Sequence, residues 1–155
     1  MKLFKKLAAA MLVAALALTM VGCGGRNSLL DQVKDRVSDV LRLNNREIAH
    51  QDDLDTLAGQ VLVEMGKAYK DGDKIGELLE DETILKAAGI ENAAGYKFVL
   101  VASSNYKSDY VNGNKVEILA NELAYRLNKY TDEAYGIAVG KVGKTEYILM
   151  AVKKK

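Results

Sequence analysis

Apolar residues recur every three or four positions along two stretches in the first half of the chain. Charged residues fill many of the positions between them, so each stretch has one apolar face and one polar face. This spacing predicts amphipathic helices over 28–45 and 53–70. Ser28 and Asp31 have the spacing of a capping box at the start of the first helix. Because the polar face of this helix carries both signs of charge, we expect its apolar face to lie in a protein core rather than on a membrane.

Two glycines, Gly59 and Gly66, lie inside the second predicted helix. Each costs about 1 kcal/mol relative to alanine in a helix interior. A residue without a side chain allows another segment of backbone to approach closely. We therefore expect a close neighbour along this side of the helix.

The pattern changes after residue 95, where short runs rich in β-forming residues replace the helical spacing. Strands are predicted over 96–102, 136–141 and 146–152, with a third long helix over 114–130. Only a short turn separates the last two strands, so they should form an antiparallel hairpin. Strands that are apolar on both faces need helices on both sides. The sequence therefore predicts a single α/β domain, a three-layer α/β/α sandwich with a small, largely antiparallel sheet.

Two short helical turns are predicted near 75–79 and 83–88, in the charged segment between the second helix and the first strand. The predicted core consists of apolar residues on the inner faces of the helices and strands. These residues are Leu54, Ala58, Leu62, Met65, Val99, Val101, Leu119, Leu123, Ile137, Val139, Ile148 and Met150.

The first 22 residues have the order of a secretory signal, with a lysine-containing start, an apolar run and small residues before a cleavage point. The apolar run, 7–20, is too short to cross the hydrocarbon of a bilayer. Val21 and Gly22 then precede Cys23, the only cysteine of the chain. This setting resembles the lipobox of bacterial lipoproteins, in which the cysteine is diacylated and becomes the mature N-terminus.

The lipobox resemblance implies three parts, a signal peptide over 1–22, an acylated tether over 23–27 and a globular domain over 28–155. Acylation of Cys23 by palmitate or a similar chain anchors such a domain in the lipid bilayer. The expected location is therefore the bacterial cell membrane, on its extracytoplasmic face, in the cell envelope.

Charge and cysteine content narrow the function further. Removal of the first 22 residues takes three lysines away and leaves 133 residues with 19 basic and 21 acidic side chains, a formal charge of −2. A slightly acidic domain argues against a nucleic-acid surface. A single acylated cysteine forms no disulfide, so the stability of the domain must come from packing.

Two parts of the chain resemble the CAP family, which comprises the cysteine-rich secretory and plant pathogenesis-related proteins and their bacterial secreted relatives. The first part is the apolar spacing of Leu54–Met65 with the preceding segment Leu43–Arg46. The second part is the closing pair of strands, Tyr135–Val139 and Tyr147–Val152. The resemblance implies a CAP-like fold for the globular domain.

The departures from the CAP pattern bear on function. Many CAP domains carry two histidines and two acidic residues in a central cleft, whereas this chain has only His50, placed before the second helix. The family's tryptophan- and serine-containing helix has no counterpart in Asn114–Tyr130. The resemblance thus implies a degenerate CAP-like lipoprotein with no metal or catalytic residue carried over. A TPM domain is the competing resemblance, because Tyr96–Val152 aligns with its strand, helix and strand, although TPM domains normally continue further.

Asp71, Asp73 and Glu82 have the spacing of the first, third and last ligands of a calcium-binding loop. Ile75 and Leu79, however, occupy two other ligand positions and offer no oxygen. The three carboxylates are therefore candidate calcium ligands, and a solvated acidic turn between helices is the alternative. No other cofactor is expected.

Candidate binding residues lie around the polar loop that follows the first strand. They are Tyr96, Ser103, Ser104, Tyr106 and Tyr110. Tyrosine supplies rigid, amphipathic area for recognition, whereas no Gly-x-Ser-x-Gly elbow frames the serines and His50 has no second histidine as a partner. The sequence predicts a non-enzymatic envelope protein that binds a peptide, glycan or protein. The alternatives are a hydrolase that uses the Ser103–Asp109 loop and a calcium-dependent protein.

Overall fold

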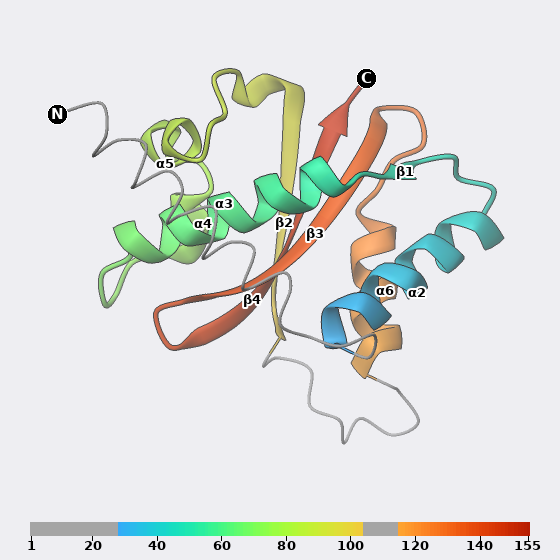
Figure 1. The fold of residues 1–155 in the computed structure, drawn as a ribbon, viewed down its shortest axis with the longest axis horizontal. Coiled ribbons are helices and arrows are strands. Elements are labelled where there is room, and N and C mark those ends of the chain that lie inside the picture. Colours follow the sequence, from blue (N-terminus) through green and yellow to red (C-terminus); the bar gives the residue numbers. More distant parts are fainter. Residues whose placement is uncertain (1–27, 104–114) are drawn as a thin grey trace, which may run out of the picture.

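Four strands form one mixed sheet in the order β1-β3-β4-β2 in the computed structural model (Figure 1). β1 (Ala49–His50) runs parallel to β3 (Asp132–Val142). β4 (Thr145–Lys154) runs antiparallel to both β3 and β2 (Tyr96–Ala102). The predicted hairpin of the last two strands is confirmed and forms the centre of the sheet.

The structure describes residues 28–103 and 115–155. The predicted signal peptide, the acylation site Cys23 and the tether lie outside these residues, as do the candidate binding residues Ser104, Tyr106 and Tyr110. None of the helices in the described parts is long and apolar enough to span a bilayer.

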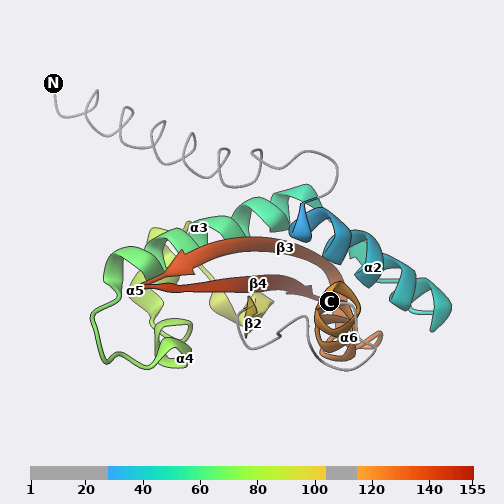
Figure 2. The same cartoon turned by 90° about the horizontal axis from the view of Figure 1, so that it is seen from below.

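Helices cover both faces of the sheet, as Figure 2 shows for α3 and α6. α3 (Asp52–Ala68) and α5 (Glu82–Ala87) share a buried apolar cluster with one face. α2 (Leu29–Leu43) and α6 (Lys115–Tyr125) share a second cluster with the other face. Side chains alternate between the faces, so consecutive residues of β4 belong to different clusters. The predicted three-layer sandwich is confirmed, with β1 as a parallel strand in an otherwise antiparallel sheet.

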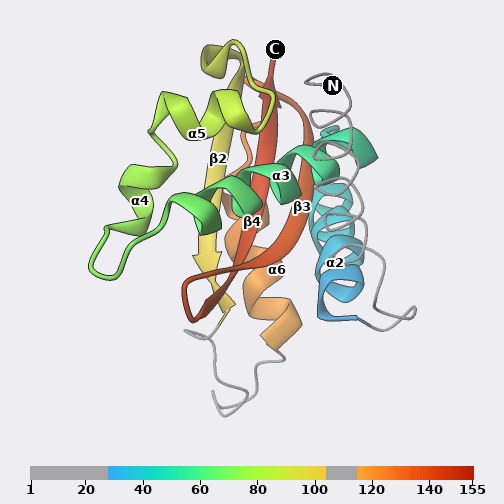
Figure 3. The ribbon, with the colours of Figure 1, turned by 60° about the vertical axis from the view of Figure 1, so that its left-hand side comes forward.

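α3 crosses its face of the sheet with α5 and α4 (Ile75–Leu78) on the same side of the molecule (Figure 3). The two helical turns predicted near 75–79 and 83–88 are therefore confirmed. A single 3-10 turn, η1 (Ala93–Gly95), then leads into β2. The predicted core residues are buried, except that Val99 and Val139 are only partly buried against the α2 and α6 cluster.

Both glycines of α3 face β3. A Cβ atom added at Gly66 would lie 3.3 Å from the carbonyl oxygen of Lys141, and one added at Gly59 would lie 3.8 Å from the Cβ of Ala138. The predicted close neighbour of this side of the helix is thus the backbone and a small side chain of β3.

Gly136 of β3 makes the closest approach to α3. A Cβ atom at this position would lie 2.2 Å from both the carbonyl carbon of Leu54 and the amide nitrogen of Asp55. Those atoms belong to helix backbone and cannot move aside separately. Glycine is therefore required at this position of the strand, and the first turn of α3 lies directly on β3.

The start of the first helix is confirmed in detail. The Ser28 hydroxyl accepts from the Asp31 N–H at 3.1 Å and donates to the Asp31 carboxylate at 2.7 Å. The helix ends at Leu43, two residues before the predicted boundary, and the second begins at Asp52, one residue early.

The predicted end of the third helix was wrong. α6 stops at Tyr125, whereas the apolar spacing predicts a helix to residue 130. Leu127 continues the spacing and is 3 % exposed, yet its N–H bonds to the Ala124 carbonyl at 3.2 Å in a tight turn. A buried residue just beyond the helix end therefore continues the apolar spacing, although the helix itself has ended.

The sheet extends further than predicted, since β4 runs from Thr145 to Lys154 rather than over 146–152. β3 begins at Asp132 rather than at residue 136. β1 was not predicted, because a strand of two residues is too short for an alternating pattern to show. Its pairing of His50 with Tyr135 places the only histidine of the chain beside the central strands.

Candidate functional site

The predicted binding residues that the structure describes lie apart. Tyr96 begins β2 and stacks on Phe98, with ring centroids 6.4 Å apart. Ser103 follows the other end of β2, where it is buried and donates to the Glu146 carboxylate at 2.6 Å. Seven residue steps along the strand place them roughly 23 Å apart, so these two side chains do not line one small site.

The three candidate calcium ligands are exposed and are not gathered into one group. Asp73 accepts from the Lys70 N–H at 2.7 Å, and Glu82 pairs with Lys86 at 3.1 Å. Among the described residues, the carboxylate and imidazole groups close enough to share a metal ion belong to His50, Asp52 and Asp55. They lie at the start of α3, away from the predicted loop.

Asp55 is the centre of a buried polar cluster. Its carboxylate accepts from the Ile137 N–H at 2.6 Å and from the Lys34 ammonium at 2.5 Å, and it lies 2.9 Å from His50 Nε2. The residue is 4 % exposed. We call Asp55, Lys34, His50 and the Ile137 N–H the Asp55 cluster. It joins α2, α3 and β3 just past the point where β1 ends.

The hydrogen bonds of the Asp55 cluster join three elements of the fold. His50 Nε2 lies 2.9 Å from the Asp55 carboxylate, whereas Nδ1 is 3.9 Å from the exposed Asp52 carboxylate, beyond hydrogen-bond distance. A catalytic histidine needs one nitrogen directed at a nucleophile or a substrate. A metal ion at this position would compete with the Lys34 ammonium for the same carboxylate.

Tyr135 lies beside this cluster and is fully buried. Its ring packs edge-on against His50, with centroids 5.6 Å apart, and its hydroxyl is 2.8 Å from that of Ser38. Burial raises the pKa of the Tyr135 phenol, the hydrogen bond with Ser38 opposes this, and the charge of Asp55 adds to it. The phenol therefore serves as a neutral hydrogen-bonding group.

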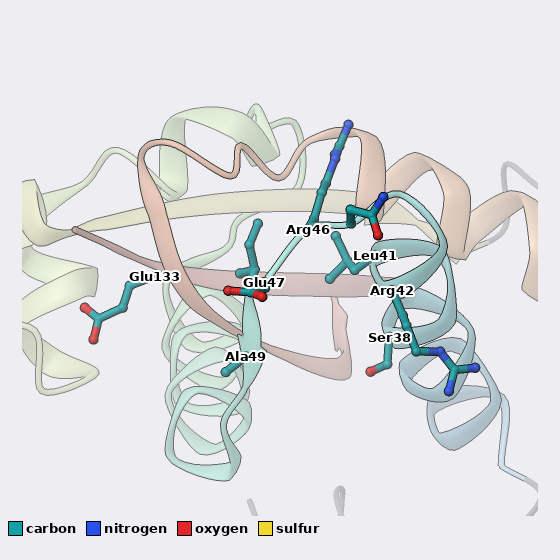
Figure 4. Close-up of a pocket in the computed structure, with 9 residues that line it drawn as sticks. Ser38, Leu41, Arg42, Arg46, Glu47, Ala49 and Glu133 are labelled. Carbon is teal, nitrogen blue, oxygen red and sulfur yellow. The ribbon is translucent and has the colours of Figure 1, made fainter.

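A different arrangement occurs where α2 and α6 end. Three cavities open around Arg46, with volumes of about 550, 200 and 610 Å³. The first has a mixed lining, and Figure 4 shows the carboxylates of Glu47 and Glu133 on the opposite side of it from the Arg42 guanidinium. Arg46 is thus the residue that the three cavities share.

The third of these cavities is strongly cationic, and we call it the basic cavity. It is lined by residues 126–131 together with Asn44, Arg46, Lys97 and Tyr125. Its described lining holds four cationic side chains and no carboxylate. In a domain with a slight excess of acidic residues, this is a clear local segregation of charge.

The end of α2 directs Arg46 toward α6. The Asn45 N–H bonds to the Arg42 carbonyl at 3.1 Å, and the Arg46 N–H bonds to the Leu41 carbonyl at 2.9 Å. These two bonds form a Schellman motif. Asn45 takes the left-handed conformation that the motif requires, with φ of 50°, which asparagine tolerates better than most residues. The chain therefore turns sharply, and Arg46 leaves the helix on the side of α6.

Cations bind carbonyl groups at the end of α6 and in the turn that follows it. Arg46 Nη1 donates to the carbonyl oxygens of Ala124 and Leu127, both at 3.0 Å. Lys97 Nζ donates to the Arg126 carbonyl at 2.8 Å. Such groups lack partners within the helix, and the helix dipole favours positive charge near them. This capping explains why α6 ends and why cations gather here.

Asp132 stabilises the turn that follows α6 from the buried side. Its carboxylate pairs with Lys97 at 2.7 Å and accepts from the Asn128 N–H at 2.7 Å, and the residue is 1 % exposed. Burial opposes its ionisation, but the hydrogen bonds from Lys97, Asn128 and Thr131 outweigh it and lower the pKa of the Asp132 carboxyl. The floor of the basic cavity is therefore fixed by an ionised carboxylate.

Exposed apolar side chains gather at this end of the molecule. Among the described residues, the large hydrophobic side chains that remain exposed are Leu43 at 71 %, Tyr125 at 80 % and Tyr130 at 76 %. Leu43 is the last residue of α2, and both tyrosines line the basic cavity. Tyrosine and arginine are the residue types most enriched at binding hot spots.

A cavity of about 790 Å³ also lies between α4 and β2. Its lining is mainly aliphatic and aromatic, with the hydroxyl groups of Thr145 and Tyr147 and a single charged side chain, Glu80. This lining offers few groups that could orient a ligand, so we regard the surface around Arg46 as the candidate site.

The sequence gives weaker signals for these residues than for the fold. Asp55 is spaced from Ala58 and Leu62 as a member of the apolar face of α3, which is the available sign that its carboxylate is buried. Arg46 follows the asparagine pair that ends α2, but nothing in the sequence indicates that it reaches α6.

No protein-family model, curated protein or solved structure matches this chain. The CAP-like and TPM-like resemblances therefore stay predictions. Function has to be inferred from the geometry of the chain itself.

Proposed function

We propose that this protein is a lipid-anchored component of the bacterial cell envelope whose domain binds its ligand without catalysis, at the surface around Arg46. The observation that carries this proposal is the coincidence, at one end of the molecule, of three adjoining cavities with exposed tyrosines and cations. A peptide, glycan or protein ligand is compatible with such a surface. The proposed CAP-like fold agrees with a binding role. Without the family's cleft histidines, such a domain keeps a surface for recognition but has no metal or acid/base site.

The position of α2 supports an anchored role. The predicted acylation site Cys23 precedes the helix by six residues, whereas the cavities lie at the other end of the helix. The 15 residues of α2 span about 22 Å. The proposed binding surface is therefore held away from the start of the domain, where the tether joins it.

The polar contacts of the described residues favour binding over hydrolysis. Ser103 is buried and donates to the Glu146 carboxylate, and it follows β2, at the opposite edge of the sheet from His50 in β1. A nucleophile needs an adjacent base that takes its proton. Within residues 28–103 and 115–155, the hydrolase and calcium-dependent alternatives have no comparable set of contacts in their favour.

Anchoring is tested by labelling cells with a palmitate analogue. The full chain should incorporate the label and fractionate with membranes, and the Cys23→Ser variant should do neither. An unlabelled wild-type chain of full precursor length would contradict the proposed anchor.

Binding is tested in intact cells with a photo-crosslinking residue at position 125, and the matched control places the same residue at position 144. Lys144 is exposed in the turn between β3 and β4, at the far end of β3 from the basic cavity. We expect a discrete adduct from position 125 that is absent from position 144. Equal adducts at both positions, or none at either, would contradict a binding surface around Arg46.

A further inference from the structure

The cations of the basic cavity are not equally neutralised. Lys97 pairs with Asp132 at 2.7 Å and Arg126 with Glu122 at 2.7 Å. The contacts of Arg46 are with backbone carbonyls, and the ammonium of Lys129 lies 5.0 Å from the centroid of the Tyr130 ring. Arg46 and Lys129 therefore line the cavity without a carboxylate partner among the described residues. An anionic ligand can supply the missing charge.

The remaining lining fits a hydrated, ring-shaped ligand. Tyr125 and Tyr130 are 80 % and 76 % exposed, so the Tyr125 ring and the face of Tyr130 away from Lys129 are open to stack against the C–H face of a sugar. Asn44 and Asn128 add side-chain amides that can bond to hydroxyl groups. The aliphatic residue of the lining is Leu127, which is 3 % exposed and offers no slot for an apolar peptide side chain.

We propose that the basic cavity binds an anionic glycan, a polysaccharide whose sugar units carry phosphate or carboxylate groups. Arg46 and Lys129 bind the anionic group, and the guanidinium can donate two parallel hydrogen bonds to it. Tyr125 and Tyr130 stack on the adjoining sugar ring. This inference rests on the proposed binding function and adds the chemical class of the ligand.

An acidic peptide is the competing ligand, and three immobilised probes distinguish it. The full-length protein in detergent is titrated onto dextran phosphate, unmodified dextran and poly-L-glutamate by biolayer interferometry. We expect the tightest binding to dextran phosphate, at least tenfold tighter than to either of the others, because only this probe combines a sugar ring with an anion. Raising the sodium chloride concentration should weaken this binding, since salt screens exposed charges.

Two charge reversals of equal size locate the site. Lys129→Glu should weaken binding to dextran phosphate at least tenfold, and Lys144→Glu should change it less than twofold. Tyr125→Ala and Tyr130→Ala should each weaken it about fivefold while leaving the net charge unchanged. Both tyrosines are exposed, and a circular dichroism melt shows that each variant folds.

Several results would overturn the inference. Equal binding to poly-L-glutamate would identify an acidic-peptide surface, and equal losses in Lys129→Glu and Lys144→Glu would identify diffuse charge attraction. Absence of binding to dextran phosphate would also overturn it. If position 125 still forms its adduct in cells, only the glycan assignment fails, whereas loss of that adduct as well removes the proposed function.

Discussion

The Asp55 cluster and the basic cavity both bring charged side chains together, but they treat those charges differently. In the Asp55 cluster the carboxylate is buried and takes its partners from a helix, a strand and β1. In the basic cavity, Arg46 and Lys129 have no described carboxylate partner, and two tyrosines beside them are exposed. A charge that is buried and fully paired holds elements together, whereas charges left open at a surface can recognise a ligand. The contrast therefore separates a structural polar cluster from a binding one.

The largest expected effect tests the structural side of this contrast. Asp55→Ala should lower the free energy of unfolding by about 3–5 kcal/mol, because it leaves a partly buried ammonium and a buried N–H without their acceptor. Lys34 is 17 % exposed, so water replaces the carboxylate only in part. Urea denaturation measures the loss.

Asp53→Ala is the matched control, since Asp53 is an exposed acid in the same helical turn. It should cost less than about 1 kcal/mol, the usual value of a charge near a helix N-terminus. Similar losses for the two variants would show that Asp55 acts only through the helix dipole.

A smaller effect is expected beneath the basic cavity. Asp132→Asn should lower the free energy of unfolding by about 2 kcal/mol at pH 7, because hydrogen bonds to the ionised carboxylate are weakened. The pKa of Asp132 is lowered in the folded state, so its stabilising effect is complete above the unfolded value near 4 and is lost as pH falls through the folded value. The difference between wild type and variant should therefore shrink when urea denaturation is repeated at pH 3 and below. A difference that stays constant with pH would mean that the charge of Asp132 is not the stabilising group.

The smallest effect on stability is expected at the exposed tyrosines. The double variant Tyr125→Ala, Tyr130→Ala should change the free energy of unfolding by no more than about 0.5 kcal/mol, because substitutions of exposed side chains rarely do more. The same variant should lose binding to dextran phosphate. A large loss of stability would show that these side chains stabilise the fold. The contrast between the Asp55 cluster and the basic cavity would then not hold.

Much of the fold could be predicted because the apolar spacing is regular. The three layers, the closing hairpin and the capping box at Ser28 follow from spacing over a few neighbouring residues. The predictions are wrong where apolar spacing continues beyond a helix end and where a strand is too short to show an alternating pattern. Leu127 keeps the helical period beyond the end of α6, and β1 is too short to show alternation.

The candidate site was harder to predict because it depends on distant partners. Asp55 reaches Lys34 across 21 positions and the Ile137 N–H across 82, and an acid in the first turn of a helix is ordinarily a surface residue. The basic cavity likewise needs Arg46 and Lys97 to meet the end of α6. The sequence instead indicates a site in the loop after β2, because tyrosines and serines are close together there along the chain.

The order of strands also governs when this protein can fold. The two central strands, β3 and β4, follow all the other helices and strands along the chain, and both helical layers pack on them. During synthesis from the N-terminus, α2 and α3 are therefore made before the strands they cover. Contacts of such long sequence separation close slowly and late. The two apolar clusters therefore cannot be completed until the segment beginning at Asp132 is available.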